Sequence, residues 1–119
     1  MRVTGIDHVQ VAAPAGCEAQ ARAFYGELLG LEELPKPEPL RSRGGCWFRA
    51  GAQELHVGVE RQFAPARKAH PGFVVDELEA LRAKLREAGQ APQDDESLPG
   101  TKRFYAEDPF GNRLEFRQA

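Results

Sequence analysis

Four residues of the chemical types that bind metal ions are spaced in two matching pairs. His8 and Glu54 lie 46 residues apart, and His70 and Glu115 lie 45 residues apart. Imidazole nitrogens and carboxylate oxygens suit divalent ions such as Zn, Ni, Fe, Co and Mn, and two histidines with one carboxylate leave positions open for a substrate. The pattern therefore predicts a divalent metal ion held by His8, Glu54, His70 and Glu115.

The two pairs belong to two halves of the chain that share one pattern. The offset is 62 residues from His8 to His70 and 61 residues from Glu54 to Glu115, so the repeat covers nearly the whole sequence. In each half a predicted strand is followed by a helix that ends in glycine and then by a strand hairpin. We expect the pseudo-symmetry of such a repeat to bring the four donor groups into one cavity.

Hydrophobic spacing predicts the elements that must position these residues. Strands place apolar side chains at every second position, whereas helices place them at intervals of three and four. We expect Asp76 to cap the second helix, residues 34–39 to form a loop or irregular edge strand, and residues 61–69 to connect the halves. The predicted strands are residues 6–12, 46–50, 54–59, 70–75, 102–106 and 112–117, and the predicted helices are about residues 17–29 and 76–88.

The alternation of side chains along a strand decides which face each candidate ligand occupies. In the last predicted strand Leu114 and Phe116 take the core side, which leaves Glu115 on the opposite, concave side. The same reasoning applied to the predicted strands over residues 6–12 and 70–75 places His8 and His70 on the concave side as well. Three of the four candidate ligands are thus predicted from face parity in addition to spacing.

The fourth ligand has a competitor, because His56 shares a strand face with Glu54. A small error in strand register would exchange the two, although the repeat selects Glu54. Any one of the histidines, taken alone, is more often an ordinary hydrogen-bonded polar residue on a half-exposed strand. The matched placement of two histidines and two glutamates favours the metal interpretation.

Further side chains with the parity of the concave face are candidates for contact with a substrate. An aromatic ring in such a place can equally pack in the core or against a second chain, and an arginine can simply pair with Glu54 or Glu115. The candidate substrate-binding residues are Trp47, Arg49, His56, Arg103 and Tyr105.

Composition argues against several other classes of function. The 119 residues, 41% hydrophobic and 29% charged, predict one folded domain over residues 1–119, with modules of about 1–60 and 68–119. Interspersed charges with a net charge of −2 argue against nucleic acid, and no apolar run reaches the ~20 residues of a membrane span. Because the chain leads straight into a strand, we expect a cytoplasmic protein. Cys17 and Cys46 are predicted to be free thiols, with a nucleophilic role as the less favoured alternative.

Taken together, several segments resemble the vicinal oxygen chelate superfamily. This group includes glyoxalase I, fosfomycin-resistance thiol transferases, methylmalonyl-CoA epimerase, extradiol dioxygenases and bleomycin-resistance proteins. The resemblance covers essentially the whole chain. The segments that carry it are residues 7–11 (DHVQV), 23–25 (AFY), 28–31 (LLGL), 70–76 (HPGFVVD) and 105–116, which end in DPFGNRLEF.

The resemblance implies an α+β fold of two tandem βαβββ modules that form a curled, incomplete-barrel sheet with helices on the outside. It also implies metal ligands at His8, His70 and Glu115, with a glyoxalase-like fourth ligand at Glu54. Family sites use the metal ion to chelate adjacent substrate oxygens and to stabilise an enolate or oxyanion. In the isomerase-like version the catalytic residue that moves a proton next to a carbonyl would be Glu54 or Glu115.

The leading functional hypothesis is a metal-dependent, glyoxalase-like enzyme that acts on a small oxygen-bearing metabolite or xenobiotic. Its reaction would be that of a lyase or isomerase, a thiol transferase or a dioxygenase. One alternative is a non-catalytic, drug-sequestering protein of the bleomycin-resistance kind, and another is an accessory domain that serves as a dimer scaffold. A homodimer is expected in each case, because curled sheets leave edges that partners in this family commonly cover, sometimes by exchanging modules. The sequence leaves open whether His8 meets Glu115 within one chain or across two.

Overall fold

The computed structural model describes all 119 residues and divides them into two compact units, residues 1–64 and 65–119. The boundary lies within the segment 61–69 that was expected to connect the halves. Each unit contains one four-stranded mixed sheet and follows the order strand, helix, three strands. The predicted α+β fold of tandem βαβββ modules is therefore confirmed. None of the helices has the length and apolar character that a membrane crossing requires.

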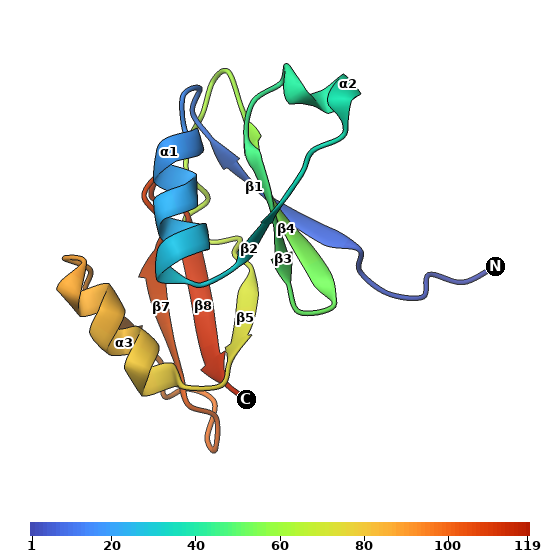
Figure 1. Ribbon diagram of the computed structural model, residues 1–119. Helices are drawn as coiled ribbons and strands as arrows, with labels where there is room; N and C mark the ends of the chain where they lie inside the picture. The colour runs from blue at the N-terminus through green and yellow to red at the C-terminus, as the bar shows by residue number, and fades with distance from the viewer. The chain divides into compact units, whose positions relative to one another are not determined.

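The first unit builds its sheet in the order β1-β4-β3-β2, with β1 parallel to β4 and the other neighbours antiparallel (Figure 1). A helix follows β1, and in the figure its α-helical and π-helical parts form one continuous coil. The elements are β1 (His8–Ala13), α1 (Glu18–Ala21), the π-helical stretch η1 (Arg22–Leu28), β2 (Glu32–Leu34), α2 (Glu38–Arg41), β3 (Cys46–Ala50) and β4 (Gln53–Val59).

The core of the first unit lies between this helix and the sheet. Tyr25 of η1 packs its ring 5.8 Å from that of Phe48 in β3, and the ring of Phe24 meets that of Tyr25 edge-on at 5.0 Å. In β4, Leu55 and Val57 are almost fully buried. Because successive side chains of a strand point to opposite faces of the sheet, this packing fixes which side chains of β4 turn away from the helix.

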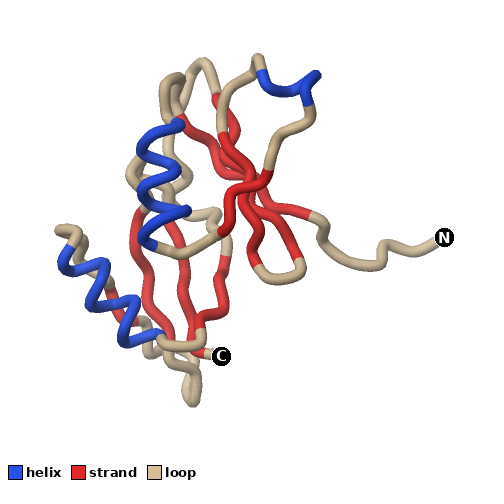
Figure 2. The backbone as a smooth tube through the Cα atoms, viewed as in Figure 1, coloured by secondary structure: helices blue, strands red, loops and turns tan.

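The second unit repeats the arrangement with the order β5-β8-β7-β6, in which β5 is parallel to β8. Leu78, Leu81 and Leu85 of its helix are buried, as their helical spacing predicts. In Figure 2 the one helix of this unit lies beside its strands, and loops connect them. The elements are β5 (Gly72–Val75), α3 (Leu78–Glu87), β6 (Gln93–Asp94), β7 (Arg103–Glu107) and β8 (Arg113–Gln118).

Several element boundaries differ from those predicted. The second helix begins at Leu78, one position after its cap Glu77, and its first N–H is satisfied by the side chain of Gln118 rather than by Asp76. Residues 34–39 hold the end of β2 and the start of α2. The short elements α2 and β6 were not predicted, because two to four residues are too few to show a hydrophobic period.

The turn between β7 and β8 is held by side chains as well as by its backbone. Asp108 Oδ1 accepts the N–H groups of Phe110 and Asn112, each at 2.9 Å, and Asn112 Nδ2 donates to Asp108 Oδ2 at 2.9 Å. Asn112 Oδ1 in turn accepts the N–H of Ala66 at 3.0 Å, and the carbonyl of Ala66 accepts the N–H of Arg113 at 2.8 Å. The predicted hairpin turn thus also fixes the chain segment that enters the second unit.

In the first unit, a charged hydrogen bond ties the start of the helix to the sheet. Glu18 Oε2 accepts the backbone N–H of Gly45 at 2.6 Å, and this bond is the largest of the effects that lower the pKa of Glu18 below its usual 4.5. Gly45 has φ of 86°, and a Cβ there would lie 2.0 Å from the carbonyl oxygen of Val57. Only glycine therefore allows the close approach on which this bond depends.

We expect Glu18→Gln to destabilise the protein by about 1 kcal/mol at neutral pH, because the bond from Gly45 loses its charged acceptor. The folded-state pKa of Glu18 lies below the unfolded value, so its contribution is present above about pH 4.5 and is lost as the pH falls through the folded pKa. Urea unfolding of wild type and variant between pH 7 and pH 3 measures this difference. If the stability difference between wild type and variant does not shrink in acid, the hydrogen bond to Gly45 is not its source. Glu87→Gln, on the exposed side of α3, is the control.

Candidate functional site

In the second unit, the predicted ligands His70 and Glu115 are in direct contact. His70 lies two residues before β5, and Glu115 pairs in register with Gly72 of that strand. The distance from His70 Nε2 to Glu115 Oε1 is 3.1 Å. Glu115 is 8% exposed, so its carboxylate faces His70 from a nearly buried position.

The other ring nitrogen of His70 determines what this contact can hold. His70 Nδ1 lies 2.8 Å from the carbonyl oxygen of Lys68, and because a carbonyl can only accept, Nδ1 must carry a proton. A neutral ring would then direct the lone pair of Nε2 at a carboxylate oxygen, and two acceptors repel each other. The pair of His70 and Glu115 is therefore complementary to a cation, either a proton on Nε2 or a metal ion.

Arg103 holds the second oxygen of Glu115. Its Nη1 lies 3.3 Å from Glu115 Oε2, while its Nη2 contacts Asp95 at 3.2 Å and the hydroxyl of Ser97 at 3.1 Å. Burial raises the pKa of Glu115, but the hydrogen bonds from His70 and Arg103 outweigh burial, so the pKa is lowered overall. The carboxylate is thus ionised and fixed in direction, and the guanidinium of Arg103 is engaged within the protein.

In the first unit, His8 and Glu54 are direct partners in the parallel pairing of β1 and β4. Their side chains have other nearest partners: His8 Nδ1 lies 2.9 Å from Asp7 Oδ2, and Glu54 Oε1 lies 2.9 Å from His56 Nε2. The carboxylate of Asp7 accepts from Nδ1, which leaves the Nε2 lone pair of His8 available to a ligand. Each unit thus places one histidine on or just before one strand of its parallel pair and one glutamate on the other strand.

His56 lies inside a stack of three rings. Its ring is 3.9 Å from that of Trp47 with an interplanar angle of 2°, and 4.2 Å from that of His8 with an angle of 14°. His56 is only 5% exposed, whereas the side chain of Glu54 is 31% exposed. The arrangement makes His56 a support for Glu54 and leaves Glu54 as the more accessible of the two competing residues. Arg49 is exposed and pairs in register with Glu54.

Neither unit by itself brings three or more histidine, cysteine or acidic side chains together in a way that could hold a metal ion. What each unit supplies is a pair, and the donor chemistry of the second pair fits a divalent ion. The two cysteines are buried free thiols, as predicted, and burial raises the pKa of Cys46 to about 11. Cys46 is therefore protonated at neutral pH.

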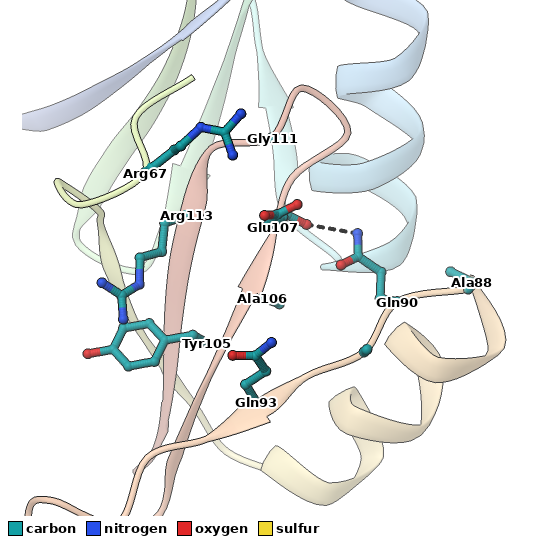
Figure 3. Close-up of a pocket in the computed structure, with 11 residues that line it drawn as sticks. Arg67, Ala88, Gln90, Gln93, Tyr105, Ala106, Glu107, Gly111 and Arg113 are labelled. Carbon is teal, nitrogen blue, oxygen red and sulfur yellow. Dashed lines mark hydrogen bonds between the residues drawn. The ribbon is translucent and has the colours of Figure 1, made fainter. Parts of the chain in front are cut away.

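Sequence reasoning missed a pocket of about 630 Å³ within the second unit (Figure 3). Tyr105, a predicted substrate contact, forms part of its wall, and the ring of Tyr105 also meets that of His70 edge-on at 5.3 Å. Arg113, two positions before Glu115, also lines the pocket, but nothing in its sequence position singled it out. The other missed polar residues of the lining are Arg67, Gln90, Gln93 and Glu107.

Comparisons with known proteins agree with this architecture. The model of the Glyoxalase/Bleomycin resistance protein/Dioxygenase superfamily matches residues 5–116. No curated protein gave a significant match to the sequence. Among solved structures, a protein from Bacillus anthracis assigned to the glyoxalase family is 55% identical with a TM-score of 0.95, and the alignment covers 99% of this chain and 97% of that chain.

Two further solved structures extend the comparison. A glyoxalase family protein from Enterococcus faecalis is 30% identical with a TM-score of 0.70, over 95% of this chain and 96% of that chain. Lactoylglutathione lyase from Agrobacterium tumefaciens has a TM-score of 0.78 over 100% of this chain and 96% of that chain, and at 18% identity it shows a shared fold alone. The family match and the fold together establish that this chain belongs to the Glyoxalase/Bleomycin resistance protein/Dioxygenase superfamily.

Proposed function

We propose that this chain is a metal-dependent, glyoxalase-like enzyme that acts on a small oxygen-bearing metabolite or xenobiotic. The observation that carries the proposal is the contact between His70 and Glu115, because an imidazole nitrogen and a carboxylate oxygen 3.1 Å apart can share a divalent ion in place of a proton. His70 and Glu115 are the proposed ligands in the second unit. The sequence repeat adds His8 and Glu54 to the proposed set. A bound divalent ion would supply Lewis-acid polarisation of substrate oxygens.

The two glutamates differ in what they can do within such a site. Glu115 is held by His70 and Arg103 and is nearly buried, which suits a ligand that stays ionised and does not move. Glu54 has a single hydrogen-bond partner, His56, and is partly exposed. A carboxylate that moves a proton must reach a substrate and change its partners, so Glu54 is the better candidate for the general base.

Metal analysis tests the proposal directly. We expect wild-type protein purified without chelator to retain a divalent ion, and His70→Ala and Glu115→Gln each to weaken its binding by at least about 100-fold. Glu87→Gln, an exposed carboxylate of α3, is the matched control and is expected to bind like wild type. Circular dichroism checks that the variants fold. Undiminished metal binding by both variants would refute the ligand assignment.

A second prediction concerns the support of Glu54 by the ring stack. His56→Ala leaves a cavity beside Trp47 and removes the partner of Glu54, so we expect a loss of about 2–4 kcal/mol in the free energy of unfolding. Trp47 is the only tryptophan of the chain. Its fluorescence emission is therefore expected to shift to longer wavelength as water reaches the exposed ring face.

Urea denaturation and the emission spectrum of the folded protein measure these two effects separately. Gln53→Ala, at an exposed position of the same strand, is the control and should change neither quantity appreciably. Wild-type stability and emission in His56→Ala would mean that the stack does not support Glu54.

The expected homodimer, the cytoplasmic location and the single domain over residues 1–119 stay predictions.

A further inference from the structure

The pocket of about 630 Å³ in the second unit has no role in the proposed metal site, and several segments of the unit build its wall. Figure 3 shows Arg67 on the segment before β5, Tyr105 and Glu107 on β7, Arg113 at the start of β8, and Gln90 in the loop after α3. The side-chain amide of Gln90 donates to the backbone carbonyl of Glu107 at 2.8 Å. This bond joins the loop after α3 to the strand and closes one side of the pocket.

The arginine side of the pocket is fixed by the turn between β7 and β8. The backbone of Ala66 is held at both its N–H and its carbonyl, by the side chain of Asn112 and the N–H of Arg113. Arg67 follows directly and is therefore positioned next to the start of β8. Gly111 completes this wall with φ of 91°, and a Cβ there would lie 3.3 Å from the side chain of Pro65.

Neither arginine of the pocket forms an ion pair with a carboxylate, in contrast to Arg82 and Arg103 of the same unit. Arg82 lies 2.7 Å from Asp94, and Arg103 lies between Asp95 and Glu115. Arg113 instead stacks its guanidinium 3.8 Å from the centre of the Tyr105 ring, and Arg67 forms no ion pair. A ring face leaves the outer N–H groups of a guanidinium available for an anion.

The charge of the lining indicates what the pocket can bind. Two guanidinium groups face the pocket against one carboxylate, that of Glu107. Planar guanidinium groups form paired hydrogen bonds with carboxylate and phosphate oxygens, and they do so best where the positions of the donors are fixed in advance. The guanidinium of Arg113 meets this condition through its contact with the Tyr105 ring, and the backbone before Arg67 is anchored at Ala66.

We infer that this pocket binds an anionic group, a carboxylate or a phosphate, of a small molecule through Arg67 and Arg113. The pocket adjoins the proposed metal ligands, since Tyr105 pairs with Glu115 across the strands and contacts His70. The anion would then be the acid end of a substrate whose other oxygens meet the metal. In naming the substrate class the inference rests on the proposed function, whereas anion binding in the pocket does not depend on a metal.

The test uses full-length protein freed of metal by a chelator, so that failure of the metal proposal does not affect it. Amide NMR spectra are recorded during titration with glycolate, with inorganic phosphate and with glycolamide, the uncharged analogue of glycolate. We expect glycolate, phosphate or both to shift the backbone signals of Gly89 and Gly111, which line the pocket, and glycolamide to leave them in place. The stronger of the two anions identifies the acid group that the pocket prefers.

Variants then decide whether the arginines carry the binding. Arg67→Gln and Arg113→Gln are each expected to weaken anion binding at least about tenfold. Arg113→Lys is expected to bind with an affinity between those of wild type and Arg113→Gln, because lysine keeps the charge but loses the planar pair of donors. Arg117→Gln removes an exposed arginine from the same strand outside the pocket and is expected to stay within about twofold of wild type. Equal binding of glycolamide and glycolate, unchanged affinity in both glutamine variants, or shifts that avoid Gly89 and Gly111 would each overturn the inference. If the protein binds metal but none of the anions, the anion-binding inference is refuted and the metal proposal is unaffected.

Discussion

The hydrogen-bonded turn between β7 and β8 is the constraint on which the chemistry of the second unit depends. The carboxylate of Asp108 closes the turn by accepting two backbone N–H groups, and the amide of Asn112 carries the constraint to Ala66. Ala66 begins the short segment that leads to His70, so one buried polar network fixes both the strand with Glu115 and the approach of its histidine partner. Buried polar groups that are fully hydrogen-bonded specify one geometry, because every alternative leaves a donor or acceptor unsatisfied.

Two kinds of charge preference follow from that geometry, side by side in one unit. At His70 and Glu115 an imidazole nitrogen faces a carboxylate oxygen, so the pair favours a cation, either a proton or a metal ion. At Arg67 and Arg113 the donors exceed the acceptors, so the pocket favours an anion. A molecule with an acid group at one end and neutral oxygens at the other satisfies both preferences. Tyr105 contacts both places, since Arg113 lies over its ring and the ring stands nearly perpendicular to that of His70.

Periodicity and the repeat predicted the succession of strands and helices along the chain, the leucine face of α3 and the shared concave face of His70 and Glu115, because burial imposes those patterns on the residues themselves. The same reasoning could not predict the partner of Glu54. His56 shares its strand face, and only the ring contacts with Trp47 and His8 show that His56 is the buried member of the pair. The pocket could not be predicted either, since its wall joins segments that carry no common hydrophobic period. The hydrogen bond from Ala66 to Asn112 that positions one of these segments joins residues 46 apart in the sequence.

The repeat predicted two equivalent pairs, and the structure makes them chemically different. Glu115 is nearly buried, is bonded at both oxygens and has its pKa lowered by His70 and Arg103, so its charge and direction are fixed. Glu54 keeps one hydrogen bond and a larger exposed surface, supported from behind by a ring stack that has no counterpart at Glu115. The two modules share their backbone pairing, but the neighbours of the two glutamates differ. Two similar residues can therefore have different tasks, one in binding an ion and the other in moving a proton. Rigidity suits the binding of an ion, and freedom to change partners suits the movement of a proton.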